Sequence, residues 1–486
     1  MSVIDWLSPR TLPGVTGPAL IEPQVAPGVF APEVEVTPLP PSQEALGLVP
    51  PEVTGLSADL WQGSDAKVLA KLISKAPVID SPTMQRLLFS LLISDSYPPL
   101  GDSHDILLLA RLDRLLDLGA PDPALALVEI AGPTASDQRF SRWFDAALML
   151  DSEDAPCAAL SDEPHLSRDM LATVYCAARR GDFSRAFLIT DAAGALGEIS
   201  LDDTELLLRF LSPEFDDSPP LPPLDGVPSP VQFRLYEAIG EPIPTTTLPR
   251  LFANADLRDV AGWKAQLYAA ERLARSGALN PNQLLGLYSA HDPAASGGVW
   301  DRVAANQRLD EALAQGNTDG IKASLPEAWS DMAQVFLEVP LAAMHARFLT
   351  GIEWDDPELA ALAWRMQLLD SGYRAAAVTA PDEDIETLFL QAVALEHAPM
   401  HMPRDAQAVA ISAGLMPSPA PSPEIADLLR NGQTGEALLR LIAQFDSGAR
   451  GNLQDLSAAL AGFRAAGLGD VANRAALELR LLDRRG

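Results

Sequence analysis

Residues 81–92, SPTMQRLLFSLL, combine the signals from which the fold of this chain can be predicted. Ser81 is a small polar residue whose side chain can accept a hydrogen bond from an unpaired amide at the start of a helix. Pro82 suits the first helical position, because its missing N–H would have had no partner there. Four leucines then recur at the spacing of one helix face. The stretch therefore predicts an amphipathic helix that begins at Pro82.

The pattern of a small polar residue, a proline and an apolar stripe recurs along the chain. The pairs are Ser81-Pro82, Asp122-Pro123, Ser229-Pro230, Asn280-Pro281, Asp356-Pro357 and Ser422-Pro423. Several stripes then stop at a glycine, which fits a left-handed residue at the end of a helix; these are Gly132, Gly240, Gly372 and Gly432. Leucine and alanine carry the apolar content, and strand-like alternation is nearly absent. The sequence predicts an all-α protein with about twenty helices from near residue 56 onward and almost no sheet.

Helical hairpins share a loose form along the chain. A glycine turn is followed, after a few residues, by an alanine, a large apolar residue and a leucine stripe, as at Gly119, Gly181 and Gly432. Small residues at such turns let helices approach closely, as in tetratricopeptide-like (TPR-like) pairs. The intervals are not constant, so we expect an irregular helical-hairpin (TPR-like) solenoid. An irregular pair of helical domains is the alternative.

Proline-rich stretches divide the chain into five segments. We expect a proline-rich tail at 1–52, an N-terminal helical domain at 53–210, a proline-rich linker or strap at 211–231, a central helical domain at 232–415 and a C-terminal helical segment at 416–486. The density of prolines in the tail removes amide donors, so we expect the tail to be disordered. The alternative is that Ile4, Trp6 and Leu7 anchor it to a partner or to the protein's own surface.

The charge of the chain restricts its partners. The sequence has 66 acidic and 35 basic residues and a formal net charge of −31. Such a surface repels nucleic acids and anionic membranes, and no apolar run approaches the roughly 20 residues that span a bilayer. The first residues lack a basic region followed by an apolar one. We therefore expect no nucleic-acid partner, no transmembrane segment, and a cytoplasmic protein, or a periplasmic one if a signal peptide precedes this sequence.

The two cysteines, Cys157 and Cys176, lie 19 residues apart. In a cytosolic protein both would be buried thiols, which behave as small hydrophobic side chains. In an exported protein they could pair, because a turn near Asp162 and a following helix would place them on neighbouring elements. A disulfide between Cys157 and Cys176 is thus one of two interpretations.

Histidine and methionine gather in one short segment of the second half. Imidazole and thioether are soft ligands, so copper(I) is conceivable there; the weak candidates are His397, Met400, His401 and Met402. Pro399 and Pro403 prevent a helix from presenting the two imidazoles on one face. An ordinary inter-helix loop is therefore the stronger interpretation, and we expect no metal.

Carboxylates cluster at four places: Asp202-Asp203-Glu205, Asp216-Asp217, Asp355-Asp356-Glu358 and Asp382-Glu383-Asp384-Glu386. Calcium binding or acid–base chemistry is conceivable, but the last two lie at predicted helix starts, where acids favour the helix dipole. The glycines of Ser296-Gly297-Gly298 could offer free amides to an anion, although a flexible joint is the stronger interpretation. The chain contains no HExxH, GxSxG, CxxC or phosphate-binding loop. We expect no catalytic residue and no cofactor.

Three segments resemble a known family. They are Ile4-Asp5-Trp6-Leu7-Ser8, the stretch 47–56 (GLVPPEVTGL) and the stretch 293–302 (PAASGGVWDR). With them the chain resembles an uncharacterised family of alphaproteobacterial proteins that often carry the label "antifreeze glycopeptide-related". The label carries no chemical information here, because the chain has no Ala-Ala-Thr repeats. The resemblance implies an exported protein with a signal peptide ahead of the Ile-Asp-Trp-Leu run, and this sequence starts almost at that run.

Together these patterns favour a non-catalytic helical scaffold that mediates protein–protein interaction, in the bacterial cell envelope. The alternative is an envelope enzyme, for example one acting on polysaccharide, whose site is assembled from scattered residues. A buried carboxylate with a high pKa in a deep cleft would favour the enzyme. A groove formed by successive helices, with charges on its rim that steer a basic or mixed-charge partner, would favour the scaffold.

Overall fold

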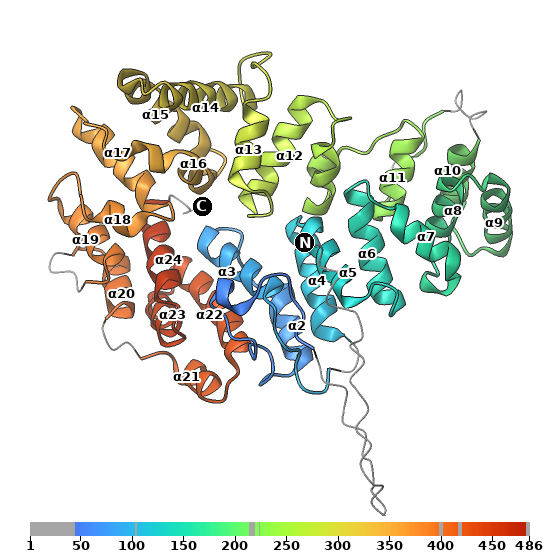
Figure 1. The fold of residues 1–486 in the computed structure, drawn as a ribbon, viewed down its shortest axis with the longest axis horizontal. Coiled ribbons are helices and arrows are strands. Elements are labelled where there is room, and N and C mark those ends of the chain that lie inside the picture. Colours follow the sequence, from blue (N-terminus) through green and yellow to red (C-terminus); the bar gives the residue numbers. More distant parts are fainter. Residues whose placement is uncertain are drawn as a thin grey trace, which may run out of the picture. The chain divides into compact units, whose positions relative to one another are not determined.

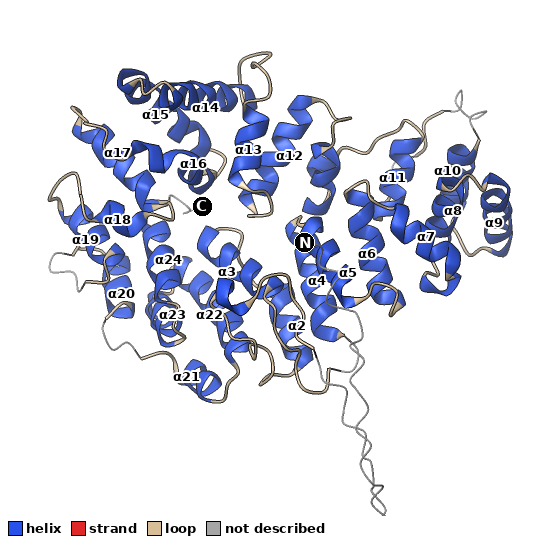
Figure 2. Cartoon of the chain, in the orientation of Figure 1, coloured by secondary structure: helices blue, strands red, loops and turns tan. Residues whose placement is uncertain are grey.

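The computed structural model describes residues 44–102, 105–212, 219–222, 224–397, 402–416 and 420–482. Within these ranges the chain is helical, and the β-structure consists of two isolated bridges (Figures 1 and 2). The predicted all-α fold is confirmed. Among the described helices, none combines the length and the apolar composition that crossing a bilayer requires.

The helices follow one another through short turns and loops. The first group comprises α1 (Pro51–Thr54), α2 (Ala66–Lys75), α3 (Pro82–Ile93), α4 (Ile106–Leu118), α5 (Pro121–Ala131), α6 (Asp137–Met149), α7 (Asp154–Asp162), the 3₁₀ turn η2 (Pro164–Leu166), α8 (Met170–Arg179), α9 (Phe183–Leu196) and α10 (Leu201–Leu211). The middle group comprises α11 (Pro230–Ala238), η4 (Thr245–Thr247), η5 (Arg250–Leu257), α12 (Trp263–Arg275), α13 (Pro281–Tyr288), α14 (Val299–Ala314), α15 (Thr318–Ala333), α16 (Glu338–His345) and η6 (Ala346–Leu349). The last group comprises α17 (Pro357–Leu368), α18 (Tyr373–Ala377), α19 (Ile385–Ala394), α20 (Ala406–Gly414), α21 (Pro423–Arg430), α22 (Thr434–Ala449), α23 (Leu453–Ala465) and α24 (Gly469–Leu481).

The predicted helix starts depend on local hydrogen bonds, and most of them form. The side chain before the proline accepts an amide of the first turn at Ser81, Ser229, Asn280, Asp356 and Ser422. The prediction for Asp122-Pro123 is wrong, because α5 already begins at Pro121 and Asp122 lies in its first turn. The cause is Gly119, which ends α4 in the left-handed conformation (φ 84°) and allows the next helix to begin two residues later.

Of the four glycines predicted to follow the end of a helix, three do so in the structure. Gly132 caps the end of α5, and Gly240 and Gly432 follow α11 and α21 with positive φ. Gly372 does not end a helix; it precedes α18 with φ −81°. The dihedral angle of Gly372 is one that any residue can adopt, so its position reflects the start of the next helix.

Residues 44–55 are held against the fold. The first helix, α1, begins at Pro51, close to the expected start near residue 56. Leu46 and Val49 form bridges with Ser96 and Ser94, so the expectation that residues 44–52 belong to a disordered tail is wrong. The cause is the buried guanidinium of Arg111, which donates to the carbonyl oxygens of Leu46 (2.9 Å) and Ser94 (3.0 Å), and also to that of Leu92. Burial lowers the pKa of Arg111 to about 10.

The core has two clusters of buried side chains. The first joins helices from both ends of the chain: it contains Trp61 and Leu88 near the start, and Phe389, Phe445 and Leu477 near the end. The second contains side chains from η5 to Leu369, just after α17, together with Leu482 near the end of the chain. The first and last described helices therefore bury a common apolar surface.

Close backbone contacts bring the last helices onto the first ones. The amide of Gly435 in α22 donates to the carbonyl oxygen of Leu60 at 2.9 Å. A Cβ atom on Gly435 would lie 2.4 Å from the ring of Trp61, so only glycine permits this approach. Beside it, α24 packs on α3 (Figure 1).

One carboxylate joins α24 to the start of α3. Glu478 accepts the backbone amide of Thr83 at 2.8 Å, the Thr83 hydroxyl at 2.7 Å and the guanidinium of Arg86 at 2.7 Å. Free amides at the start of a helix favour an anion. The last helix thus supplies a cap for α3 in addition to Ser81.

We expect Glu478→Ala to lower the free energy of unfolding by about 2–4 kcal/mol, because it leaves the buried Thr83 amide without an acceptor. Glu478→Gln should cost less, since an amide oxygen can still accept from Thr83. Chemical denaturation measures both. The control is Glu424→Ala, whose side chain is 67% exposed in its ion pair with Arg440 and should contribute less than about 1 kcal/mol. Equal effects at the two positions would contradict this role of Glu478.

A buried histidine lies in the second core cluster. Neither ring nitrogen of His345 has a hydrogen-bond partner within the described residues, and Asp310 lies 3.9 Å from its Nδ1. Burial lowers the pKa of His345 from 6.5 to about 4, although Asp310 acts in the opposite direction. The imidazole is therefore neutral in the folded protein at neutral pH.

This histidine predicts an acid-sensitive stability. Its folded pKa is depressed, so the unfolded chain binds the proton more tightly, and the stability is complete above pH 6.5 and falls as the pH is lowered towards 4. The loss should reach about 3 kcal/mol. Denaturation at several pH values should show this loss in the wild type and a flatter profile in His345→Leu. An unchanged slope in the variant would assign the acid sensitivity to other groups.

Candidate binding groove between the first and last helices

A large cavity lies where the two ends of the described chain meet. It has a volume of about 1080 Å³ and is lined from the α2–α3 connection, the starts of α19 and α20, the turn between α22 and α23, and α24. Residues from Pro77 to Met84 form one wall, and residues from Ala475 to Leu482 form another. The contact between Glu478 and Thr83 therefore sets the separation of these walls.

The floor of this groove is apolar. Met84, Leu390 and Phe445 line it and are almost completely buried. Gly448 lets α22 approach α23, because a Cβ atom there would lie 2.5 Å from the backbone of Leu456. The close packing of these helices shapes a surface on which an apolar side chain of a ligand can lose its water.

A clamp around Arg480 forms one side of the groove. The guanidinium binds both carboxylate oxygens of Glu386, at 2.9 and 2.6 Å, and also Asp405 at 2.9 Å. Burial disfavours the charge of Arg480, but the hydrogen bond and charge of Glu386 outweigh it and raise the pKa of Arg480. Asp405 also caps α20; burial opposes its ionisation, yet the Ala408 amide and Arg480 lower its pKa. These charges hold three helices together and are already paired.

Glu478 is the carboxylate of the groove that most resembles a catalytic acid. Burial raises the pKa of Glu478, while Arg86 and Thr83 act in the opposite direction. Its two oxygens are occupied by Thr83 and Arg86, and its side chain is 5% exposed. A general acid needs a proton that a substrate can reach. The contacts of Glu478 instead suit the joining of α24 to α3.

Two charges of the groove remain open. Asp80 and Arg365 are exposed and line it, and neither forms a hydrogen bond or ion pair within the described residues. Asp446 pairs with Arg450 at 3.1 Å, on the same helix. An apolar floor with unpaired charges of both signs at its margin suits a peptide segment that carries apolar and charged side chains.

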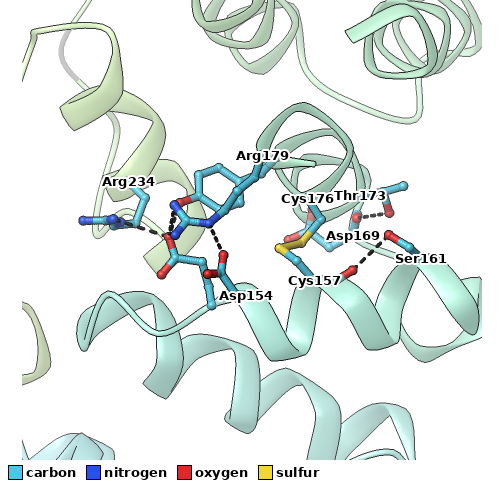
Figure 3. Close-up of a disulfide and its surroundings, with 10 residues drawn as sticks. Asp154, Cys157, Ser161, Asp169, Thr173, Cys176, Arg179 and Arg234 are labelled. Atoms are coloured by element: carbon cyan, nitrogen blue, oxygen red, sulfur yellow. Dashed lines mark hydrogen bonds and ion pairs between the residues drawn. A yellow bond between two sulfur atoms is a disulfide. The ribbon is translucent and has the colours of Figure 1, made fainter. Parts of the chain in front are cut away.

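The cysteines lie outside the groove, and they are bonded to each other. Cys157 in α7 and Cys176 in α8 form a disulfide with their Cα atoms 4.9 Å apart (Figure 3). Both residues are buried. The structure thus has the paired form, one of the two interpretations that the sequence allows.

A buried polar network surrounds this disulfide (Figure 3). The hydroxyl of Tyr175 donates to Glu153 at 2.6 Å, and Arg179 and Arg234 lie 3.0 and 3.4 Å from the same carboxylate oxygen. Burial raises the pKa of Tyr175 to about 12, and the hydrogen bond to Glu153 adds to this effect. The network ties α7, α8 and α11 together around the disulfide.

The other predicted positions fall in three groups. His397 and Met402 are exposed, Met400 and His401 lie outside the described residues, and no cluster of three metal-ligating groups occurs in the described part. The candidate anchors Ile4, Trp6 and Leu7 also lie outside it. Of the acidic clusters, Asp356 and Asp384 cap α17 and α19 as expected.

The glycines before α14 already have an acidic partner. The amide of Gly297 donates to the carboxylate of Asp301 at 2.9 Å. Asp301 lies in the first turn of the same helix. This local contact takes the position that an external anion would occupy.

One further carboxylate has a strongly shifted pKa. Burial raises the pKa of Asp145 in α6 to about 7; Arg142 opposes the shift, and Asp169 and Asp113 add to it. Asp145 lines neither the groove nor the two smaller cavities between α12 and α14 and between η6 and α18. Asp145 could not be identified from the sequence, because its position within an ordinary amphipathic stripe offers no signal.

Removing the disulfide should destabilise the protein. A cross-link that closes a loop of this separation, 19 residues, restricts the unfolded chain and contributes about 3 kcal/mol. We expect the double variant Cys157→Ala/Cys176→Ala to lose about this amount in chemical denaturation, and a reducing agent to act on the wild type alone. Non-reducing peptide mapping of protein made in an oxidising compartment checks the pairing directly. Two free thiols there would contradict the bridge.

No protein-family model, no curated protein and no solved structure matches this chain. The chemistry of the groove is therefore inferred from its own side chains.

Proposed function

We propose that this chain is a non-catalytic helical scaffold that binds a segment of a partner protein in the groove between α3 and α24. The observation that carries the proposal is the state of the charges in the groove. The buried ones, on Glu478 and Arg480, are held by neighbouring helices, whereas Asp80 and Arg365 are open. A site of this kind can recognise a charged ligand without altering it.

We infer that the partner segment is basic or of mixed charge. The lining contains five carboxylates and three guanidiniums, and the whole chain carries a net charge of −31. Such a field attracts a basic chain and accelerates its association at low salt. The Arg365 guanidinium then selects for an acidic residue beside the basic ones.

The proposed architecture is the irregular TPR-like solenoid. Pairs of consecutive helices pack on each other, among them α8 with α9, α14 with α15 and α22 with α23. The turn of each pair contains a glycine with positive φ, at Gly181, Gly316 and Gly451. In helical repeats, each hairpin buries its apolar face against the next, which would explain why buried side chains continue from one hairpin to another.

The proposed location is the periplasmic side of the bacterial envelope. The disulfide between Cys157 and Cys176 supports it, because such bonds persist in oxidising compartments. The resemblance to the exported alphaproteobacterial family points to the same compartment. The polysaccharide-acting enzyme remains the second candidate, because Glu478 combines burial, a raised pKa and a position in the groove.

Site-specific crosslinking tests the scaffold. A photoreactive residue placed at Asp80 or Arg365 should capture a protein partner in native cells, whereas the same residue at the exposed Glu198, outside the groove, should not. The captured protein is then purified for binding measurements. Crosslinking of the same proteins from all three positions would show a non-specific surface.

Charge reversal tests the groove with this protein and its captured partner, both purified, and the direction of each change in affinity can be predicted. Asp80→Lys and Arg365→Glu should each weaken binding of the mixed-charge partner segment by about two- to fivefold, since exposed charges contribute up to about 1 kcal/mol each. Both effects should shrink at high salt, and Glu198→Lys should have none. Turnover of an envelope polysaccharide that is lost in Glu478→Gln, with the fold intact, would establish the enzyme instead.

A further inference from the structure

A second cavity, separate from the groove, is lined mainly by aromatic and apolar side chains. It has a volume of about 700 Å³ and lies between η4, η5, α12 and the start of α14. Trp263, Tyr268 and Trp300 line it, together with Lys264 and Asp256. It shares no lining residue with the groove.

Trp263, at the centre of the aromatic surface of this cavity, is held in place by contacts within the fold. The indole N–H of Trp263 donates to the carbonyl oxygen of Leu287 at 2.9 Å. The Trp263 ring lies edge-on to His291 at 5.2 Å and tilted against Trp300 at 5.1 Å, measured between ring centroids. A platform fixed in this way loses little side-chain entropy when a ligand binds.

The start of α14 fixes the position of Trp300. Gly298 precedes the helix with φ 63° and ψ −122°, a conformation that favours glycine. Two residues after Trp300, Arg302 binds both oxygens of the buried Glu271 at 2.7 Å. The first turn of α14 is thus anchored in the core while Trp300 faces the cavity.

The polar groups of the cavity divide into occupied and open ones. Arg272 donates to the carbonyl oxygens of Thr245 and Leu248, and Asp256 accepts the Thr245 hydroxyl. Four donors remain: the indole N–H of Trp300, the hydroxyls of Tyr268 and Thr246, and the ammonium of Lys264. None of them forms a hydrogen bond or ion pair within the described residues. The cavity is therefore apolar and offers mainly donors to a ligand.

We propose that this aromatic cavity binds a proline-rich segment of a partner protein in the polyproline II conformation, with an acidic residue beside the prolines. A polyproline II chain has no internal hydrogen bonds, so its carbonyl oxygens are free to accept from Trp300 and Tyr268. Its prolines carry no N–H and need no acceptor in the cavity. Flat proline rings pack on aromatic surfaces, which is how aromatic grooves recognise such segments.

The charge of Lys264 supports the acidic residue of the ligand. In a chain with a net charge of −31, this ammonium has no carboxylate partner within the described residues, and it lies 5.8 Å from the centre of the Tyr268 ring. A carboxylate of the ligand would complement it. A carbohydrate fits less well, because each of its buried hydroxyls needs an acceptor as well as a donor, and the open groups of this lining are mainly donors.

Titration of the full chain with labelled peptides tests the proposal. The probe is the peptide PPLPPEPPLP, and the controls are the same peptide with glycine for every proline, the glutamine variant of its glutamate, and cellohexaose. The glycine peptide should bind at least about tenfold more weakly, because it must lose more conformational entropy. The glutamine peptide should bind about two- to fivefold more weakly to the wild type and equally well to Lys264→Gln.

Variants of the cavity complete the test. Tyr268→Phe removes one hydroxyl and should weaken binding of the probe about two- to tenfold; Trp300→Leu should weaken it at least about tenfold. The matched control, Trp354→Leu, alters a tryptophan that lines another cavity and should have no effect. Equal binding of the proline and glycine peptides, no loss in Trp300→Leu with an unchanged circular dichroism spectrum, or tighter binding of cellohexaose than of the probe would each overturn the proposal.

Discussion

The contact between Glu478 and the first turn of α3 is the constraint on which the rest of the structure depends. A carboxylate on the last helix accepts a backbone amide and a hydroxyl of Thr83, so two segments from opposite ends of the described chain share one hydrogen-bonding site. The apolar core connects the same two ends of the described chain, because its first cluster contains both Trp61 and Leu477. The groove has its walls on these two segments, and its shape requires the contact.

Other carboxylates also join helices through hydrogen bonds and ion pairs. A carboxylate, a tyrosine hydroxyl and a guanidinium meet at the buried Glu153 and at the buried Glu271. The exposed Asp470 forms a similar set with Tyr373 and Arg374. Packed leucines and alanines can slide with little change in energy, whereas a hydrogen-bonded triad is satisfied in one arrangement. In this chain such triads join helices and fix their relative positions more precisely than apolar packing alone would.

The features that the sequence predicted correctly are those set by residues close together in the chain. Ser229 and Asn280 could be identified as helix caps because the cap, the proline and the apolar stripe lie within one turn. Asp122 was misplaced because Pro121, one residue earlier, is an equally good first residue. Residues 44–52 were misassigned because their partner, Arg111, lies far along the chain and resembles any other helix arginine.

The groove could not be predicted for the same physical reason. Asp80, Glu386 and Arg480 belong to three ordinary helical patterns, and only the tertiary packing places them around one cavity. The disulfide could be predicted only in part. The separation of the cysteines allowed a bond between neighbouring helices, but the residues alone did not decide between bonded and free thiols. The aromatic cavity contains Trp263 and Trp300, which lie far apart in the sequence and meet only through the packing of α12 against α14.

The Thr83–Glu478 contact also governs the order in which the chain can fold. It joins residues 395 positions apart, and the entropy of closing such a loop exceeds that of a loop of about 40 residues by only about 2 kcal/mol. The free-energy cost of closing this long loop is therefore small, but Glu478 is still synthesised long after Thr83. Until residue 478 has left the ribosome, the leucines of α3 lack the helix that covers them. A nascent chain of this kind exposes apolar surface for most of its synthesis and is a natural client for a chaperone.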